Sequence, residues 1–152
     1  MSAGDAEIRP YEDRDFDVLV RAWHETNQES FPYVALQQQH TPDDARRFFR
    51  DHVVPVARIW VADADGELQG LVALEAPWIR QLAVFPPFQR RGIGSALLRA
   101  AQAASPAELR LYTFFRNAAA RAFYQRHGFT AIAFGVSPAP ESEPDVLYRR
   151  QG

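Results

Sequence analysis

The chain contains no cysteine and no lysine, and these two absences remove several kinds of chemistry. Without cysteine it can form no disulfide, no thiolate metal site and no acyl-cysteine intermediate. The 17 basic residues are all arginines, and 19 acidic residues bring the formal net charge to −2. Since this balance gives no global basic field, we do not expect the protein to bind nucleic acid.

Long apolar runs are also missing. No hydrophobic stretch reaches the length that crosses a bilayer, and no apolar signal segment follows the polar first residues. We therefore expect a cytoplasmic protein with no membrane partner. Hydrophobic residues make up 47% of the 152 residues, which is typical of a folded globular chain. The length suits one domain over residues 1–152 and is too short for two ordinary ones.

Strand and helix signals alternate along the chain and predict an α/β (α+β) fold. Thr41-Pro42-Asp43-Asp44 is typical of a helix start, and Asp13 or Asp15 is placed to cap an earlier helix. Ala64-Asp65-Gly66-Glu67 indicates a hairpin between two strands. Residues 30–40 receive no assignment. We expect strands over residues 7–9, 58–63, 68–74, 78–84, 109–112, 129–134 and 146–149, and two later helices ending near residue 104 and spanning 117–127.

The stretch from Gln81 to Ala101 is the most informative part of the sequence. Pro86-Pro87 removes two backbone donors, so the strand before it must end there. Gln89-Arg90-Arg91-Gly92-Ile93-Gly94 follows, and a strong helical run begins at Ser95. A helix start binds anions through unpaired N–H groups and its dipole, while glycines allow close approach and arginines add charge. The stretch therefore predicts a polyphosphate-binding loop.

Two common phosphate-binding loops do not fit this stretch. A P-loop needs Gly-Lys-Ser/Thr, and the chain has no lysine. A dinucleotide fingerprint needs a third glycine or an alanine where Leu97 stands. With Val84-Phe85-Pro86 before it, the loop instead resembles motif A of the GCN5-related N-acetyltransferases (the GNAT superfamily). That motif reads Gln/Arg-x-x-Gly-x-Gly/Ala after a strand ending in Val-x-Pro, and it covers residues 82–104 here.

A second segment, residues 117–129, resembles motif B of the same family, Asn-x-x-Ala-x-x-hydrophobic-Tyr-x-x-x-Gly-Phe. On local grounds alone, Asn117 suits a helix cap, Phe123 a buried helix face and Gly128 a helix end. Tyr124 taken in isolation is equally well explained as a core aromatic. The two motifs stand at a compatible separation, and together they indicate the family.

The resemblance implies a single domain with a mixed, mostly antiparallel sheet of six to seven strands, flanked by about four helices. It implies acetyl-CoA as cosubstrate and no metal. In that reading the Val84 N–H polarises the thioester carbonyl, and the Tyr124 phenol protonates the departing sulfur. The expected coenzyme-binding residues are Leu82, Ala83, Val84, Gln89, Arg90, Arg91, Gly92, Ile93, Gly94, Ser95, Asn117 and Tyr124.

The general base is less well defined. Histone-type members of the family carry a catalytic glutamate on the strand before motif A, and Trp78 occupies that position here. Glu75, just upstream, is the candidate base and would act through a water, although a solvated acid at a strand end explains it too. A route through water alone, or through one of the four histidines, stays open.

The acceptor is expected to be a primary amine, either of a small molecule or of a peptide or protein, and a homodimer is compatible with the sequence. In this family the first two helices and the loop before the last strand build the acceptor site. The loop offers Glu141, Glu143 and Asp145, which also read as ordinary surface acids. The candidate acceptor-binding residues are Trp23, Glu29, Phe31, Tyr33 and Trp78.

A non-catalytic acyl-CoA-binding or sensing module is the alternative function. Such a binder needs only the phosphate loop, whereas this chain also has Asn117 and Tyr124, and these two residues favour an enzyme. The missing strand glutamate points the other way.

Overall fold

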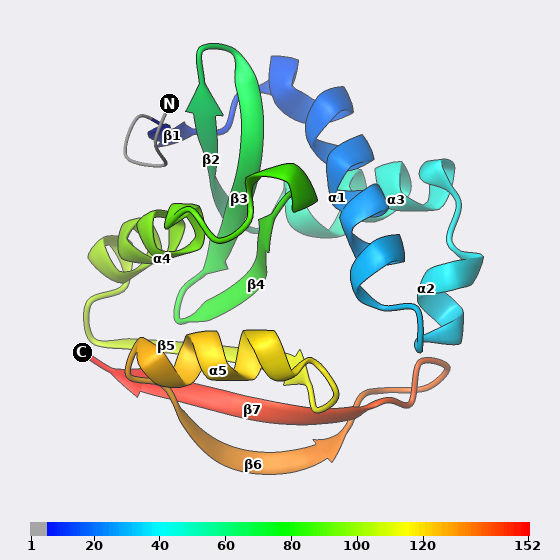
Figure 1. The fold of residues 1–152 in the computed structure, drawn as a ribbon, viewed down its shortest axis with the longest axis vertical. Coiled ribbons are helices and arrows are strands. Elements are labelled where there is room, and N and C mark those ends of the chain that lie inside the picture. The colour runs from blue at the N-terminus through cyan, green and yellow to red at the C-terminus, as the bar shows by residue number, and fades with distance from the viewer. Residues whose placement is uncertain (1–5) are drawn as a thin grey trace.

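A computed structural model describes residues 6–152, which form one mixed sheet flanked by helices (Figure 1). Two one-turn 3-10 segments and one turn of π-helix occur between the main elements. The strands are β1 (Glu7–Pro10), β2 (Arg58–Ala64), β3 (Glu67–Glu75), β4 (Trp78–Val84), β5 (Glu108–Phe114), β6 (Thr130–Val136) and β7 (Pro144–Gln151). The helices are α1 (Phe16–Ser30), α2 (Ala35–Gln39), α3 (Pro42–Phe48), α4 (Ile93–Ala104) and α5 (Ala118–Arg126).

The sheet of the described residues has seven strands in the order β1-β2-β3-β4-β5-β7-β6. All neighbours are antiparallel except β4 and β5, which are parallel and pair at a single position, Trp78 with Arg110. One backbone hydrogen bond, from the Arg110 N–H to the Pro77 carbonyl at 2.8 Å, reinforces that point. Beyond it the two strands diverge, so the sheet is split at its centre. The predicted fold class is confirmed.

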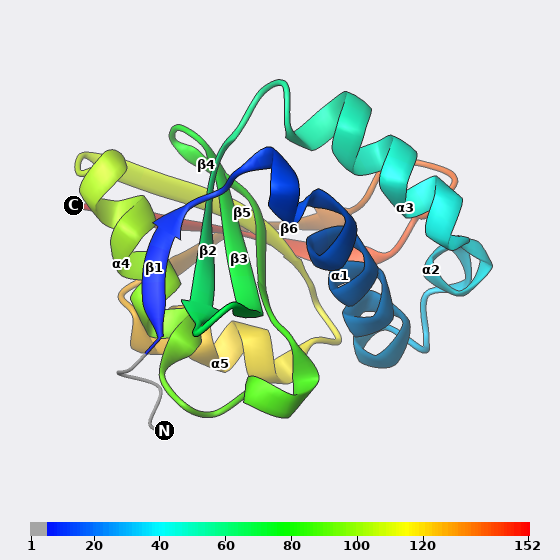
Figure 2. The same ribbon diagram turned by 90° about the horizontal axis from the view of Figure 1, so that it is seen from above.

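Helices cover both faces of the sheet (Figure 2). β3 is buried on both faces, with Leu71 and Ala73 packing in the cluster beneath α1 and α3, and Val72 and Leu74 packing in the cluster beneath α4. Because paired residues on neighbouring strands lie on the same face of the sheet, this alternation also determines which of their side chains face α1 and α3 and which face α4. No helix of residues 6–152 has the length and apolarity needed to cross a membrane.

The helix starts follow from their capping residues. The Thr41 hydroxyl accepts a hydrogen bond from the Asp44 N–H at 3.1 Å, and the Asp44 carboxylate accepts one from the Thr41 N–H at 2.9 Å. Pro42 occupies the first helical position, so the predicted start of α3 is confirmed. Asp15, one of the two expected caps, precedes α1.

Several elements differ in extent from the sequence expectation, including β5 (Glu108–Phe114 rather than residues 109–112) and β6 (Thr130–Val136 rather than residues 129–134). Residues 30–40, left unassigned, contain the short helix α2. α4 begins at Ile93 rather than Ser95, because Gly92 adopts the left-handed conformation that starts the helix there. β7 spans Pro144–Gln151 rather than residues 146–149, since it lies between β5 and β6 and is paired along both sides.

A buried ion cluster joins β1, β2 and the start of α1. The Arg9 guanidinium donates to both carboxylate oxygens of Asp15, at 2.8 and 2.9 Å, and to Asp63 at 2.9 Å. The Arg9 and Asp15 side chains are 14% and 6% exposed. The hydrogen bonds from Arg9 lower the pKa of Asp15 and of Asp63 below the ordinary carboxyl value.

Replacing Arg9 by methionine should lower the free energy of unfolding by about 3 kcal/mol at neutral pH, because it leaves the Asp15 carboxylate buried without its cation. Depressed carboxyl pKa values stabilise the native state above the ordinary carboxyl pKa, and this stability is lost as the pH falls through the folded pKa. The difference between wild type and Arg9→Met should therefore shrink toward about pH 3. Urea unfolding of both proteins at several pH values measures this difference in the free energy of unfolding.

Arg14→Met is the matched control, since the Arg14–Glu12 pair is exposed. Such pairs contribute about 0.5 kcal/mol or less. An equal loss in both variants would contradict the assignment of this stability to the Arg9 cluster.

Candidate functional site

A cavity of about 1020 Å³ opens where β4 and β5 diverge and extends to α1 and α2. Its walls come from elements far apart in the sequence, which the split sheet brings together. The walls include Trp23, Asn27, Phe31, Gln37 and His40 from α1, α2 and the turns beside them, Gln81, Leu82 and Ala83 from β4, Tyr112 and Phe114 from β5, Asn117 and Tyr124 from the start and body of α5, and Phe134, Glu141 and Asp145 from the β6–β7 region.

The backbone of β4 carries free hydrogen-bonding groups into the split. Phe85, just beyond β4, donates its N–H to Gln69 on the β3 side at 2.9 Å, so alternation turns the N–H of Ala83 the same way. The N–H and C=O of Leu82 and the N–H of Val84 then face β5, where parallel pairing has already ended, while the Val84 C=O on the same side accepts from the Gln89 side chain. An extended ligand can add there as a strand.

A β-bulge interrupts β4 at its start. Leu74 pairs with Ile79 and Ala73 pairs with Gln81, which leaves Arg80 as the extra residue. Because of this extra residue, Ile79 and Leu82 both reach the cluster beneath α4, while Gln81 turns toward α1. The Trp23 indole N–H donates to the Gln81 side-chain oxygen at 3.0 Å, which fixes α1 to β4 across the cavity.

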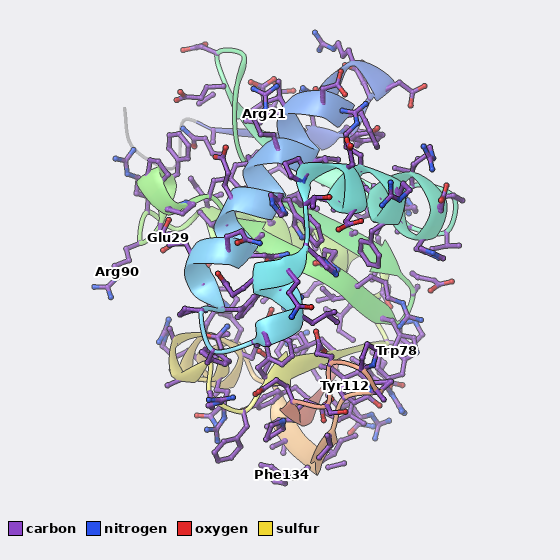
Figure 3. The ribbon with its side chains drawn as sticks, turned by 90° about the vertical axis from the view of Figure 1, so that its right-hand side faces the viewer. Arg21, Glu29, Trp78, Arg90, Tyr112 and Phe134 are labelled. Carbon is purple, nitrogen blue, oxygen red and sulfur yellow. The ribbon has the colours of Figure 1, made fainter. Side chains whose placement is uncertain are left out.

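The predicted phosphate-binding loop follows β4 and leads into α4. Arg90 and Gly92 both have positive φ, at 64° and 83°, so the backbone turns sharply and exposes its N–H groups. The Gln89 side-chain amide donates to the Val84 carbonyl at 2.9 Å and ties the loop to the strand. Arg90 and Arg91 are exposed, and Figure 3 shows Arg90 reaching into solvent. The geometry is that of an anion-binding helix start.

Close packing explains why the residue at position 94, in the first turn of α4, is a glycine. A Cβ there would lie 3.3 Å from the Phe123 ring of α5, tighter than ordinary van der Waals contact. Next to it, the Ser95 hydroxyl and the His127 Nε2 are 3.0 Å apart, which joins the start of α4 to the end of α5. The loop is thus held from both sides.

Asn117 and Tyr124 face the same cavity from α5. The Asn117 side-chain oxygen accepts from the Ala120 N–H at 3.2 Å as a helix cap, which leaves its amide protons for the cavity. Tyr124 packs against Phe129 and Tyr148 and also lines the cavity. Burial raises the pKa of the Tyr124 phenol above its ordinary value, so the phenol stays protonated and can donate.

The predicted acceptor residues separate into two groups. Trp23 and Phe31 line the cavity, and Phe31 meets the Phe114 ring at 5.0 Å. Tyr33 lies behind them, with the Arg116 guanidinium 4.5 Å from its ring centre and its hydroxyl buried without a hydrogen-bond partner. Glu29 lies beside the Pro86–Phe88 turn, on another surface depression.

Glu75 and Trp78 also lie outside the cavity wall. The Glu75 carboxylate accepts from the Arg80 Nε at 2.9 Å, and both side chains are more than 40% exposed. Trp78 stacks on Tyr112 with ring centres 5.6 Å apart, and Figure 3 shows the two side by side. A base at Glu75 would therefore have to act from the rim.

Several cavity residues were not singled out from the sequence. Gln81 is a polar residue inside an apolar strand, and that contrast is a usable signal. Asp145 is one of three acids that the sequence offers for the acceptor-site loop and that also read as ordinary surface acids, and it lines the cavity from β7. Among residues 6–152, no cluster of three or more histidine, aspartate or glutamate side chains is arranged to hold a metal ion.

Known proteins share both the sequence pattern and the fold. The acetyltransferase (GNAT) domain family matches residues 55–131. The peptidyl-lysine N-acetyltransferase YiaC of Escherichia coli (strain K12) is 30% identical over 126 residues, which are 82% of this chain and 84% of that protein.

Two solved structures show the same architecture. The solution structure of apo YjaB from Escherichia coli has a TM-score of 0.79 at 21% identity and covers 97% of this chain and 98% of that one. The PaiA N-acetyltransferase from Thermoplasma acidophilum, solved with coenzyme A, has a TM-score of 0.70 at 19% identity and covers 97% and 99%.

The sequence match over residues 55–131 and the shared architecture agree with each other. The chain belongs to the GNAT superfamily and is an acetyl-CoA-dependent N-acetyltransferase.

Proposed function

We propose that the protein transfers an acetyl group from acetyl-CoA directly to a primary alkylamine, the side chain of a lysine in a peptide or protein or a small molecule with the same end. The observation that carries this is one continuous cavity with Leu82, Asn117 and Tyr124 in one part and Trp23 and Phe31 in another. The relative YiaC, which acts on peptidyl lysine, supports the acceptor class. A cytoplasmic setting and a homodimer stay predictions from the sequence.

The coenzyme side is built mainly from backbone. In the proposal, Leu82 and Val84 pair with the pantetheine arm through the N–H and C=O groups that face the split. The loop from Gln89 to Ser95 holds the pyrophosphate at the start of α4, with Arg90 and Arg91 supplying charge. The Asn117 amide protons complete this side.

The chemical step needs a neutral amine, a polarised carbonyl and a proton for the leaving sulfur. The Val84 N–H faces the split and is positioned to polarise the carbonyl. Tyr124 supplies the proton, since its phenol stays protonated at neutral pH. Direct attack is favoured because the chain has no cysteine to carry the acyl group.

Arg91→Glu should weaken coenzyme binding at least about tenfold, because it places a carboxylate where the proposal puts the pyrophosphate. Calorimetric titration with coenzyme A measures the change. Arg21→Glu is the control, since this exposed arginine on α1 undergoes the same charge reversal away from the loop. Unchanged affinity in Arg91→Glu would refute the loop assignment.

Tyr124→Phe should lower kcat about 100-fold and leave the KM for acetyl-CoA within a few-fold, because only the proton donor is lost. Thiol release with an amine panel gives both constants. Tyr148→Phe is the matched control, since this neighbouring phenol is fully buried and takes a hydrogen bond from Arg121 outside the cavity. A Tyr124→Phe enzyme as fast as the control would remove Tyr124 from the mechanism.

Initial-rate kinetics should show a sequential pattern, with intersecting double-reciprocal lines for acetyl-CoA and amine, since both substrates occupy the cavity together. Parallel lines would indicate a covalent acyl-enzyme and would contradict direct transfer. If no amine of the panel accelerates thiol release, the non-catalytic binding module is favoured instead.

A further inference from the structure

The acceptor part of the cavity contains a carboxylate that the mechanism has not used. Asp145 is the first residue of β7 that is paired on both sides, opposite Phe114 on β5 and Gly135 on β6. Its neighbours Val146 and Tyr148 are buried in the cluster beneath α4 and α5. Since side chains alternate along a strand, Asp145 faces the opposite side, toward α1 and α2.

The position of Asp145 along the strands also matches that of the proposed thioester site on β4. Trp78 and Arg110 are paired. With the extra residue Arg80 left out of the count, four positions further along each strand Ala83 and Phe114 lie at the same level across the split. Asp145 is the partner of Phe114. It therefore lies on the next strand at the level of the β4 backbone that, in the proposed function, presents the thioester.

The charge of Asp145 is not neutralised by the protein. Within residues 6–152 its carboxylate makes no ion pair and no hydrogen bond, while its loop neighbour Glu143 is paired with Arg116. Glu141 lines the cavity as well and takes only a long hydrogen bond, 3.5 Å, from the Gln37 amide. Arg80, the arginine of the cavity wall, is already paired with Glu75.

The surroundings of Asp145 favour a cation. The aromatic rings of Phe31 and Phe114 meet at 5.0 Å in the cavity wall, and Phe114 is the partner of Asp145 on β5. A carboxylate beside aromatic ring faces is a typical environment for an ammonium group, which is attracted by the carboxylate charge and by the ring faces.

We propose that Asp145 binds the acceptor as an alkylammonium and takes the proton that the nitrogen must lose before it attacks. This inference rests on the proposed function and adds to it a second catalytic side chain, on the acceptor side. It also specifies the acceptor as an amine that arrives charged.

Asp145, Tyr124 and solvent together account for every proton in the reaction. One N–H bond of the ammonium breaks and Asp145 gains the proton. The freed lone pair forms the N–C bond, the C–S bond breaks, and sulfur takes the Tyr124 proton. The nitrogen then loses its second proton, which restores the phenol. Asp145 releases its proton to solvent, so each turnover yields one proton, the acetylamide and the free thiol.

The electrostatics of the site agree with this role. Burial, and then the neighbouring Glu141 carboxylate, raise the pKa of Asp145 above its ordinary value. A more basic carboxylate accepts a proton from an ammonium more readily. The other charged or titratable groups around it are the Glu143–Arg116 pair on the same side, His40 on the opposite wall and the Glu75–Arg80 pair at the rim.

The test compares two acceptors of the same shape. One is a short lysine peptide, and the other is the same peptide with an aminooxy group in place of the terminal aminomethyl, which is uncharged at neutral pH. Asp145→Asn should lower kcat/KM about 100-fold for the lysine peptide and less than about threefold for the aminooxy peptide, which has no proton to give up first. It should also remove the acidic limb of the pH profile with the lysine peptide.

Asp145→Asn keeps the side-chain shape and breaks no protein contact, so thermal unfolding and coenzyme affinity should match wild type. Asp65→Asn, the same change at the exposed β2–β3 turn, is the control and should leave both acceptors unaffected. Glu75→Gln tests the rival carboxylate.

The outcomes separate the hypotheses. An equal loss on both peptides, or no loss on either, would overturn the role of Asp145. A lysine-selective loss in Glu75→Gln but not in Asp145→Asn would assign the base to Glu75. If the wild-type enzyme acetylates neither peptide nor any amine of a panel, the proposed function itself fails, and coenzyme titration would still report on the phosphate loop.

Discussion

The split between β4 and β5 is the constraint on which the rest of the structure depends. Two antiparallel halves meet through a parallel pair that holds at Trp78 and Arg110 only. Since parallel strands end at the same edge of a sheet, the segments that follow them also meet there. The phosphate loop before α4 follows β4, and Asn117 at the start of α5 follows β5. The proposed coenzyme site therefore depends on strand direction as much as on motif residues.

The two sides of the cavity are built differently. The proposed coenzyme side consists of backbone groups, the helix start and two arginines, which suit a long, phosphate-bearing ligand. The acceptor side uses side chains from α1, β5 and the β6–β7 region, with aromatic rings and acids. The hydrogen bond between Trp23 and Gln81 connects them, because Gln81 belongs to the strand that carries the coenzyme. The positions of α1 and β4 are thereby coupled.

Much of the fold could be read from local sequence, because capping residues and turn residues act locally. Thr41 with Asp44, and the Asp65-Gly66 turn, specify their elements within a few residues. The bulge at Arg80 could not be read this way, since it shifts the alternation and turns Gln81 toward α1. The position of β7 between β5 and β6 is a long-range pairing, and it gives Asp145 its place in the cavity. The sequence shows Glu75 only as an acid at a strand end near motif A. Its ion pair with Arg80, which holds it at the rim of the cavity, becomes visible only in the structure.

The cations of the phosphate loop, Arg90 and Arg91, have a further chemical consequence. A thioester in solution acylates exposed lysines without any enzyme, and this chain has no lysine to offer. A guanidinium stays protonated and offers no lone pair to a thioester. In the proposed function, the coenzyme is thus held by charges that stray acetylation cannot remove.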